Sequence, residues 1–524
     1  MTGHAGSGRP EGPVTPSLPS RHPWPTVDLG TTPSQDNALA LVPESYAAAN
    51  DLVPLQLEGE TLVVACADPG DEAMLNELRV LARRRVRALG APRAEIQEAI
   101  QERYEVLEHV EAHVRAFTER LERSAGPDAR SVLQGIDEQS PVVNVVNLII
   151  TQGLRDRASD IHLEPQRTHL RVRFRIDGIL TDRLRLPQSI APSLSSRLKV
   201  MANLDIVDRH RAQDGQFRFE SDGRPVDVRV STMETQWGEK VVLRLLDQSR
   251  TLLRLDQLGL EGEAYHRLAG LLRSPFGLVV VSGPTGSGKT TTLYAAINEL
   301  DPISQNITTI EDPIEYTFEN INQIPIRRVA NLTFANGLKA ILRQDPDVIM
   351  IGEVRDRETA EIAVQSALTG HLVLCSLHAT DAAGVIQRFS EMGIEGFLTS
   401  SALVGVVAQR LVRRICTYCR QPCQLGAEER RLWFEHGDPE KTVFYRGRGC
   451  VHCAQTGYRG RIGVFEVMAV SEPIKHLIGL RASTQEIRSQ ALREGMRTLR
   501  EDGLRKVAND LTTLSEVVRC LWVS

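Results

Sequence analysis

Long apolar runs are missing from this sequence of 524 residues. The most apolar window, Val142 to Ile150, is too short to span a bilayer, and Asn144 and Asn147 interrupt it. Prolines occupy the N-terminal region, where a signal peptide would need an apolar core. We therefore expect no transmembrane helix and no secretion signal, and we predict a cytoplasmic protein.

A basic excess is missing as well. Lysine and arginine number 62 against 67 aspartate and glutamate residues, which gives a formal net charge of −5. No overall positive field therefore favours nucleic acid as a partner, and such a role would need a local basic patch. Hydrophobic residues (41%) and charged residues (25%) fall in the range of globular proteins, and the length predicts about three or four domains.

Cysteine is scarce, and four of the eight cysteines form two C-x-x-C pairs. The pairs are Cys416 with Cys419 and Cys450 with Cys453. In a reducing compartment such pairs favour metal binding over disulfide bonds. Four thiolates fit a closed, tetrahedral and therefore structural site, so we predict bound Zn²⁺; four reduced cysteines without metal are the alternative.

The centre of the chain carries a phosphate-binding motif. An apolar run from Gly277 to Ser282 leads into G-x-x-x-x-G-K-T, and a helical segment follows, which is the context that defines a P-loop. Its glycines allow turns in which backbone N–H groups converge on phosphates. Lys289 is predicted to bridge the β- and γ-phosphates of ATP, and the Thr290 hydroxyl to bind Mg²⁺. The predicted nucleotide-binding residues are Gly283, Pro284, Thr285, Gly286, Ser287, Gly288, Lys289, Thr290 and Thr291.

Three further apolar runs follow the P-loop, and acidic residues or histidines flank them. In a parallel sheet, ligands bind at the carboxyl ends of the strands. Glu353 is predicted to be the carboxylate that holds Mg²⁺ through water or polarises the attacking water, and Glu311 is the competing candidate for the general base. His371 and His378 are predicted to sense the γ-phosphate, although a lone histidine is more often a packed or surface residue.

A strand pattern precedes the P-loop region. From Leu170 to Gly178 apolar residues alternate with arginine before an Asp-Gly turn, so one face is core and the other carries a row of positive charge. A helix is predicted at Val142 to Leu154, with more strands at Val226 to Val230 and Val241 to Leu246. We therefore predict an α+β domain over residues 139–250. Its arginines form either a solvated face or a surface toward a neighbouring subunit's nucleotide.

The remaining regions differ in composition and in predicted secondary structure. Residues 1–36 are rich in glycine, proline, serine and threonine and are predicted to form a disordered tail. A small α/β docking module is predicted for 37–104 and a charged linker for 105–138. Residues 251–524 are predicted to form the P-loop ATPase domain, with a zinc-binding insertion at 416–453. The predicted C-terminal helices are Ser471 to Leu480, Thr484 to Glu494 and Leu514 to Cys520.

Taken in order, these motifs resemble the ATPases of type II secretion and type IV pilus assembly, from about Gln139 to Leu521. As an ordered set they are specific to that family, which the P-loop alone is not. The segments that carry the resemblance, besides the P-loop, are Asp160 to Pro165, Gln213 to Gly215, Thr309 to Tyr316, Arg343 to Asp347, Gly352 to Asp356, Leu368 to Thr380 and Gly457 to Arg461.

The resemblance implies an α/β protein with a RecA-like ATPase domain, preceded by a PAS-like α+β domain. It implies a homohexameric ring in which ATP binds between these domains and hydrolysis moves one against the other. The motion would power assembly of a pilus or secretion pseudopilus, through an inner-membrane platform protein and a cytoplasmic adaptor at that membrane. Arg197, Arg209 and Arg229 best match the family's arginines that approach the phosphates.

Two alternatives stay open at this point. A DNA- or conjugation-linked ring motor would expect a basic stripe, and the net charge of −5 counts against it. A nucleotide-gated assembly factor without significant turnover would not require both Glu311 and Glu353. In the N-terminal module we find only the second half of the family's regulatory domain, so cyclic di-GMP is not predicted as a ligand.

Overall fold

The computed structural model describes residues 24–39, 41–97, 99–100, 141–221, 224–246 and 253–522. It divides into two compact units, Met1–Glu105 and Val106–Ser524, each of which we describe by itself. The predicted linker and the first part of the predicted tail lie outside the described residues. No described helix is both long and apolar enough to cross a bilayer.

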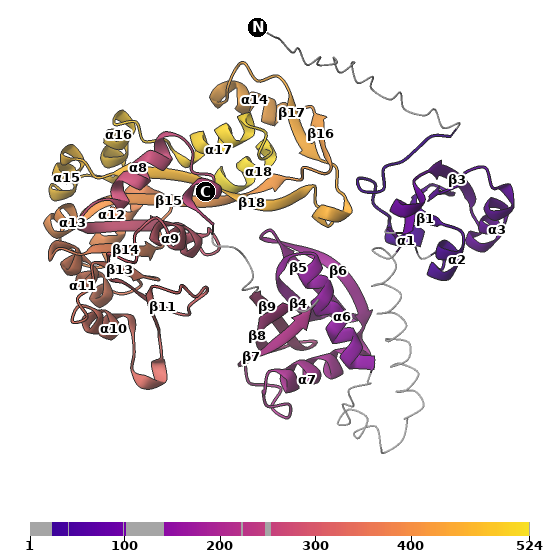
Figure 1. The fold of residues 1–524 in the computed structure, drawn as a ribbon, viewed down its shortest axis with the longest axis horizontal. Coiled ribbons are helices and arrows are strands. Elements are labelled where there is room, and N and C mark those ends of the chain that lie inside the picture. Colours follow the sequence, from indigo (N-terminus) through magenta and orange to yellow (C-terminus); the bar gives the residue numbers. More distant parts are fainter. Residues whose placement is uncertain are drawn as a thin grey trace, which may run out of the picture. The chain divides into compact units, whose positions relative to one another are not determined.

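The first unit is built on a three-stranded sheet with the order β1-β2-β3 (Figure 1). Strands β1 and β2 are antiparallel, β2 and β3 are parallel, and the inner strand β2 is almost completely buried. The elements are α1 (Asp36–Leu39), α2 (Glu44–Ala49), β1 (Leu52–Glu58), β2 (Thr61–Cys66), α3 (Glu72–Ala82) and β3 (Arg85–Gly90). The Asp71 carboxylate caps α3 by accepting the N–H of Met74 at 3.0 Å.

Residues 24–36, which fall in the predicted tail, pack on this unit. Thr26 forms a parallel β-bridge with Gly90, Leu29 is only 2% exposed, and the Gln35 N–H donates to the carbonyl of Leu55 at 2.7 Å. The predicted boundary at residue 37 therefore falls inside the folded unit. Composition alone missed this, because one buried leucine and a few backbone hydrogen bonds order a segment rich in proline and threonine.

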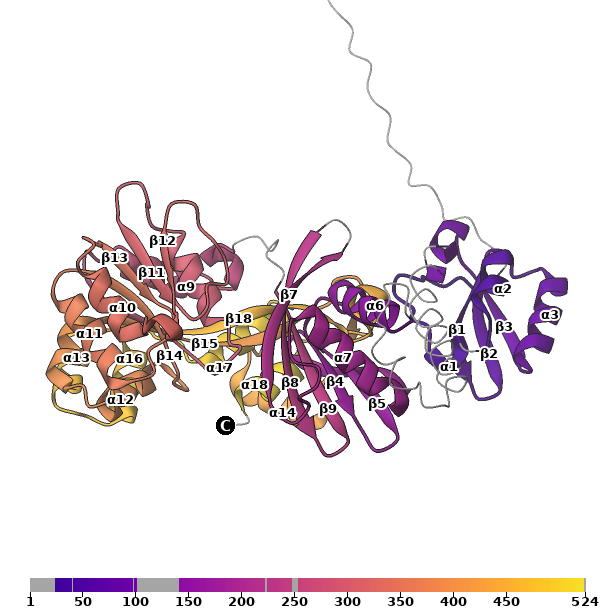
Figure 2. The ribbon, with the colours of Figure 1, turned by 90° about the horizontal axis from the view of Figure 1, so that it is seen from below.

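The second unit begins with an antiparallel sheet of six strands in the order β6-β5-β4-β9-β8-β7. Helices α6 and α7 contribute to a single apolar core with the strands, which include a fully buried Phe174. The elements are α6 (Pro141–Arg155), β4 (Ala158–Pro165), β5 (His169–Ile176), β6 (Ile179–Pro187), η1 (Gln188–Ile190), α7 (Ala191–Met201), β7 (Gln213–Ser221), β8 (Arg224–Thr235) and β9 (Gly238–Leu246). Figure 2 shows these strands side by side.

A larger sheet follows, with the order β12-β11-β13-β14-β10-β15-β18. All neighbours are parallel except β18, which is antiparallel to β15. Strand β10 lies between β14 and β15, and all six of its residues are buried. The strands are β10 (Gly277–Ser282), β11 (Ile307–Glu311), β12 (Asn322–Pro325), β13 (Val348–Ile351), β14 (Leu372–Leu377), β15 (Leu403–Ile415) and β18 (Tyr458–Ala469).

Helices cover both faces of this sheet and build two cores. One core contains residues of α10, α11, α12, α15 and α16, and the other contains residues of α8 and α9. The helices and helical turns up to the insertion are η2 (Leu255–Leu258), α8 (Glu263–Leu272), α9 (Lys289–Ile297), η3 (Arg328–Ala330), α10 (Phe334–Ile341), α11 (Arg357–Leu368), α12 (Ala382–Glu391) and α13 (Gly396–Ala402).

The C-terminal region contains the three predicted helices and one more. Helix α17 was not predicted, although its start carries a capping box in which Thr498 and Glu501 exchange hydrogen bonds. These helices are α15 (Glu472–Gly479), α16 (Thr484–Arg493), α17 (Leu499–Ala508) and α18 (Leu514–Leu521).

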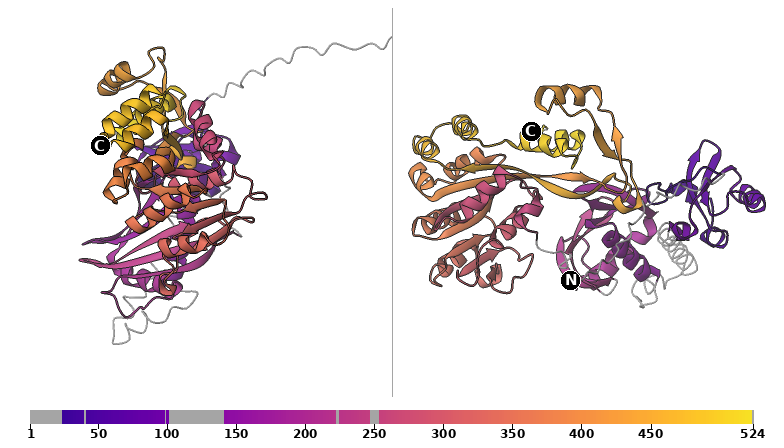
Figure 3. Two further views of the ribbon diagram at one scale, coloured as in Figure 1. Left: turned by 90° about the vertical axis from the view of Figure 1, so that its left-hand side faces the viewer. Right: turned by 45° about the horizontal axis from the view of Figure 1, so that its top comes forward.

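Strands β15 and β18 form a long antiparallel arm (Figure 3, in orange). Strand β15 pairs with β10 only as far as Ala408, and residues 409–415 continue past that end of the sheet. The predicted insertion joins the two strands of the arm. It holds β16 (Arg420–Cys423), α14 (Ala427–His436), β17 (Phe444–Gly447) and η4 (Val451–Cys453).

Candidate active site

The P-loop follows β10 and leads into α9. Gly283, Gly286 and Gly288 have φ angles of 150°, 77° and 87°, which side chains disfavour. A Cβ atom at Gly283 would also lie 2.5 Å from the carbonyl oxygen of Gln409. The turn therefore requires glycine, and it brings the N-terminus of α9, with its unpaired N–H groups, to the edge of the sheet.

Gln409 supports this loop, and the sequence did not point to it. It lies on β15, is 1% exposed, and its Nε2 donates to the carbonyl of Ser287 at 2.7 Å. Because strand β15 was not predicted, its pairing with β10 could not be predicted either. The available signal was the apolar run Leu403 to Ala408, which ends directly at Gln409.

Lys289 is folded back over the P-loop. Its Nζ donates to the carbonyls of Gly283 at 3.0 Å and Pro284 at 3.1 Å, and lies 3.5 Å from Nδ1 of His378. Burial lowers the pKa of Lys289, and the nearby Glu353 carboxylate opposes that effect. The ammonium group therefore sits in a partly desolvated position, where the attraction of an anion is strong.

Glu353 and His378 complete this cluster. Glu353 follows β13 and His378 follows β14; Nε2 of His378 lies 2.8 Å from Oε1 of Glu353. Arg355 holds the other carboxylate oxygen at 2.6 Å. Burial alone would raise the pKa of Glu353, but the hydrogen bond and charge of Arg355, with His378 and Lys289, hold it below its ordinary value. Glu353 is therefore ionised at neutral pH.

Glu311 is placed differently. It ends β11, is 2% exposed, and accepts hydrogen bonds from the Tyr294 hydroxyl, from Thr309 Oγ1 at 2.6 Å and from Gln323 Nε2 at 3.2 Å. Burial, with the Glu311 carboxylate, raises the pKa of Tyr294. Tyr294 belongs to α9, so Glu311 is linked to the helix that follows the P-loop. Both of its oxygens are occupied by protein donors.

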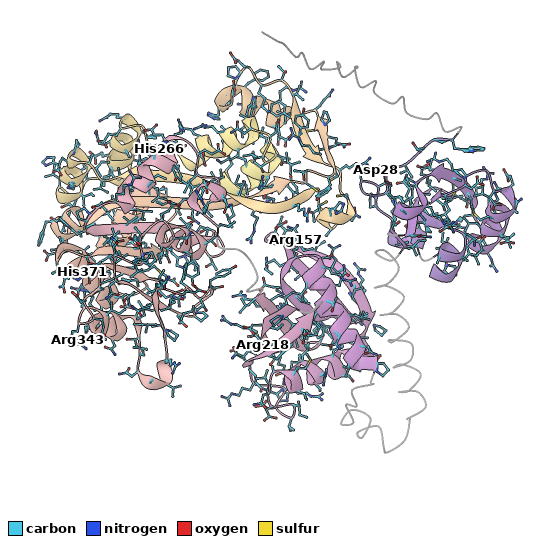
Figure 4. The ribbon with its side chains drawn as sticks, viewed as in Figure 1. Asp28, Arg157, Arg218, His266, Arg343 and His371 are labelled. Carbon is cyan, nitrogen blue, oxygen red and sulfur yellow. The ribbon has the colours of Figure 1, made fainter. Side chains whose placement is uncertain are left out.

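His371 lies far from the P-loop (Figure 4). It precedes β14 instead of following it, and its carbonyl accepts the N–H of Gly277, at the start of β10. Its Nδ1 lies 2.9 Å from the carbonyl of Ser366. The six residues of β10 separate this edge from the P-loop by about 20 Å. The prediction that His371 lies at the phosphate site of its own chain is therefore wrong.

The remaining nucleotide residues lie around the loop as follows. Pro284, Thr285 and Gly286 are exposed at its tip, and Thr290 is partly buried in the first turn of α9. Thr291 is exposed and lines a cavity of about 600 Å³ that lies between the arm, α9 and the α+β domain. This cavity adjoins Gly288, so it opens directly beside the P-loop.

Of the three predicted arginines, only Arg229 faces the ATPase domain. It lies on β8 and lines a cleft of about 260 Å³ together with Glu315 and Tyr316, from the segment after β11. Arg209 is exposed in the loop before β7, and Arg197 is partly buried on α7. Neither lines that cleft.

The arginine row of β5 is neutralised within its own sheet. Arg171 and Arg173 donate to Glu164 at 2.9 and 2.8 Å, and Lys240 lies 3.1 Å from the same carboxylate. Arg175 lies 3.5 Å from Asp160. Burial would raise the pKa of Glu164, but these cations lower it to about 2. The arginines of β5 are thus paired with acidic side chains of their own sheet, and they are neither fully solvated nor unpaired and available to bind a phosphate.

The four paired cysteines converge at the end of the arm. Their Sγ atoms all lie within 4.8 Å of one another, with 3.7 Å between Cys416 and Cys450 and 3.9 Å between Cys419 and Cys453. A tetrahedral site with Zn–S bonds of about 2.3 Å requires sulfur atoms about 3.8 Å apart. The N–H groups of Cys450 and Gly457 also point at Cys453 Sγ, which stabilises a thiolate. The residues therefore fit zinc.

A P-loop at the middle of a largely parallel sheet, with Lys289, His378 and Glu353 at its carboxyl edge, defines a RecA-like P-loop ATPase. The same fold occurs in the ATPase DotB of Legionella pneumophila, whose solved structure has a TM-score of 0.52 and 19% identity and covers 71% of this chain and 93% of that one. The P-loop lies where a parallel sheet binds its ligand.

The family model described as "Type II/IV secretion system protein" matches residues 136–519, and an MshEN domain model matches residues 22–109. The chain belongs to the type II/IV secretion system protein family and is a secretion or pilus assembly ATPase. The MshEN match begins before Trp24, in agreement with the packing of residues 24–36 on the first unit.

This chain is similar both to type IV pilus assembly ATPases and to type II secretion system proteins. The type IV pilus assembly ATPase PilB of Myxococcus xanthus is 40% identical over 521 residues, which cover 97% of this chain and 91% of that protein. Type II secretion system protein E of Dickeya dadantii is 42% identical over 494 residues, covering 91% and 96%. HxcR of Pseudomonas aeruginosa, a type II secretion system protein, is 47% identical over 394 residues, covering 75% and 80%.

Proposed function

We propose that this protein converts ATP hydrolysis into movement between its α+β domain and its P-loop domain, and thereby drives assembly of a pilus or secretion pseudopilus. The observation that carries the proposal is the cluster of Lys289, His378 and Glu353 at the P-loop, together with a cavity beside Gly288 that both domains line. A hydrolysis site at a boundary between domains can turn phosphate release into domain motion.

The nucleotide would be held by the P-loop. Its backbone N–H groups and the N-terminus of α9 would bind the phosphates, and Lys289 would leave the carbonyls of Gly283 and Pro284 to reach them. Thr290 and Glu353 would hold Mg²⁺, the latter directly or through water. When bound, Mg²⁺ neutralises the phosphate charge that grows during phosphoryl transfer.

The geometry favours Glu353 over Glu311 as the carboxylate that faces the terminal phosphate. Glu353 is ionised and contacts His378, which also lies 3.2 Å from the Gly283 carbonyl. Glu311 would first have to exchange its hydrogen bonds with Tyr294 and Thr309. We therefore propose that Glu353 contacts the metal and the attacking water. Glu311 would connect β11 to α9 for as long as its hydrogen bonds with Tyr294 and Thr309 remain intact.

Two hydrogen bonds connect the domains elsewhere. The Gly460 N–H donates to Asp177 at 2.9 Å, and Arg183 donates to the carbonyl of Ala454 at 3.3 Å. Both join the arm and its cysteine end to the α+β domain.

The ring and its partners belong to the same proposal. The relatives are named as parts of pilus and secretion machines, so we propose a homohexamer that docks, in the cytoplasm, on an inner-membrane platform protein and an adaptor. In such a ring, Arg197 and Arg209 would approach the nucleotide of a neighbouring subunit, since neither lines the cleft of its own chain.

We also propose that Cys416, Cys419, Cys450 and Cys453 bind one structural Zn²⁺. Metal binding is coupled to folding, so replacing Cys416 and Cys450 by serine should release zinc and unfold the end of the arm. Cys423→Ser is the matched control, because Cys423 lies nearby on β16 but outside the cluster. Elemental analysis of the reduced native protein should give one zinc per chain; no zinc would refute the assignment.

The function is tested by separating binding from turnover. Glu353→Gln should lower kcat by about a hundredfold or more while ATP still binds, because a neutral amide cannot polarise water or neutralise the metal. Glu358→Gln, an exposed carboxylate paired with Lys339, should not change kcat. Full activity of the Glu353 variant would refute the role of Glu353 in turnover. Turnover in the native protein too low to detect would favour a nucleotide-gated factor instead.

A further inference from the structure

Most of the arginines between residues 24 and 100, in the N-terminal unit, lie in one short stretch. Between residues 24 and 100 the sequence has six arginines, no lysine and twelve acidic residues. Five of the six arginines fall within nine consecutive residues, at the end of α3 and in β3: Arg79, Arg83, Arg84, Arg85 and Arg87. The unit is therefore acidic overall and basic at one end.

Two aliphatic side chains protrude among these arginines. Val80 is 78% exposed and Leu81 is 43% exposed. Val80 lies on the face of α3 opposite to Met74, Leu75 and Leu78, which are buried against the sheet, and Leu81 lies at the margin of that buried face. Figures 1 and 2 show α3 on the side of its unit away from α1.

Only part of the positive charge is neutralised within the unit. Arg79 lies 3.4 Å from Glu72, and Arg87 lies 2.7 Å from Glu58. The three arginines at 83–85 are exposed and pair with no acidic side chain in the part of the unit that the structure describes. Apart from Nη1 of Arg84, which donates to the carbonyl of Arg83 at 3.2 Å, these neighbouring guanidinium groups keep their charge and donors available for an anion.

We propose that the surface from Arg79 to Arg87, which we name the α3 patch, binds directly to an anionic lipid bilayer. The guanidinium groups would pair with headgroup phosphates, and Val80 and Leu81 would enter the boundary between headgroups and acyl chains. This goes beyond docking through partner proteins, because here the chain itself contacts lipid without crossing the membrane.

The composition of the α3 patch favours lipid over an acidic protein. A stable protein interface buries about 800 Å² per partner, with aromatic anchors in pockets. The stretch from 79 to 87 contains no aromatic residue, and its two aliphatic side chains protrude instead of lining a groove. A lipid surface needs only clustered cations and shallow aliphatic contact.

The test is flotation of the full-length protein with vesicles of phosphatidylcholine, with and without phosphatidylglycerol. Binding should require phosphatidylglycerol and should weaken as salt rises, because salt screens exposed charges. Replacing Arg83, Arg84 and Arg85 together by glutamine should weaken binding about a hundredfold, at about fivefold per arginine. Val80→Ser with Leu81→Ser should weaken it further at constant charge.

The matched control is Arg93→Gln, the one arginine between residues 24 and 100 that lies outside the α3 patch; Arg93 pairs with Asp51. It should bind vesicles as the native protein does. ATP turnover and thermal melting show that each variant is folded. Absence of binding to phosphatidylglycerol vesicles, or equal binding by the triple variant, would overturn the proposal. A purified acidic protein bound through the patch, with no vesicle binding, would assign the patch to a protein interface.

Discussion

The two sheets of the second unit distribute polar side chains differently. In the parallel sheet, β10, β13 and β14 are buried along their whole length, and the reactive groups come just past their ends. In the antiparallel sheet, charged residues alternate with apolar ones along β5, and Glu164 and Asp160 neutralise them. One sheet gathers its charged groups at an edge, beside the P-loop, while the other pairs its charges across a face. Substitutions in the first should therefore affect turnover, and those in the second stability.

The strongest test of this contrast is Lys289→Ala. We expect ATP turnover to fall by about a thousandfold, since the ammonium group is the P-loop cation nearest to the phosphates. The melting temperature should change little, because Lys289 contacts only carbonyls of the loop and His378. Lys339→Ala, which removes an exposed lysine paired with Glu358, is the control. Wild-type turnover in the Lys289 variant would end the catalytic interpretation.

Arg229 sharpens the comparison, because it belongs to the antiparallel sheet but faces the ATPase domain. Arg229→Ala should lower kcat by about tenfold and leave thermal stability unchanged, since the side chain lines the cleft beside Glu315 and Tyr316. Steady-state kinetics with a melting curve separates the two effects. A loss of stability with normal kcat would place Arg229 with the neutralised charges of its own sheet.

Glu164 should respond in the opposite way. Its pKa of about 2 in the folded protein lies below the ordinary value of 4.5, so it stabilises the fold above pH 4.5 and loses that contribution as the pH falls toward 2. Glu164→Gln should lower the free energy of unfolding at pH 7 by about 2 kcal/mol and flatten its dependence on pH in that window. Denaturant titrations at several pH values measure this.

The smallest effect is expected for Arg218→Ala. Arg218 pairs with Asp227 at 3.2 Å, but it is largely exposed, so the ion pair is screened by water and salt. The free energy of unfolding should change by less than about 0.5 kcal/mol, and kcat should not change. A larger change would mean that Arg218 interacts with charged residues of this sheet other than Asp227.

The sequence predicted the parts of the fold whose pattern is local. The alternation of β5, helix α6, three C-terminal helices and the strand–P-loop–helix order all appear in the structure, because each depends on neighbouring residues only. The long strand β15 was missed, and with it the support that Gln409 gives the P-loop. Its pairing with β10 joins residues more than a hundred positions apart.

The site was predicted to a similar extent. Glu353 and His378 follow their strands, and they meet at the P-loop as the carboxyl-end rule requires. His371 was misplaced, because it precedes β14 and therefore lies at the amino end of that strand, whereas the P-loop lies at the carboxyl end of the sheet. The partners of Arg171 and Arg173 could not be predicted, because they come from β4 through register.

The central claim is that Lys289, His378 and Glu353 surround the terminal phosphate of ATP. A crystal structure with Mg²⁺ and a non-hydrolysable ATP analogue tests it most directly. We predict that Lys289 turns from the carbonyls of Gly283 to the β- and γ-phosphates, and that Glu353 lies within reach of the metal or of a water next to the γ-phosphate. A structure with Glu353 and Glu311 both remote from the metal and the terminal phosphate would contradict the account.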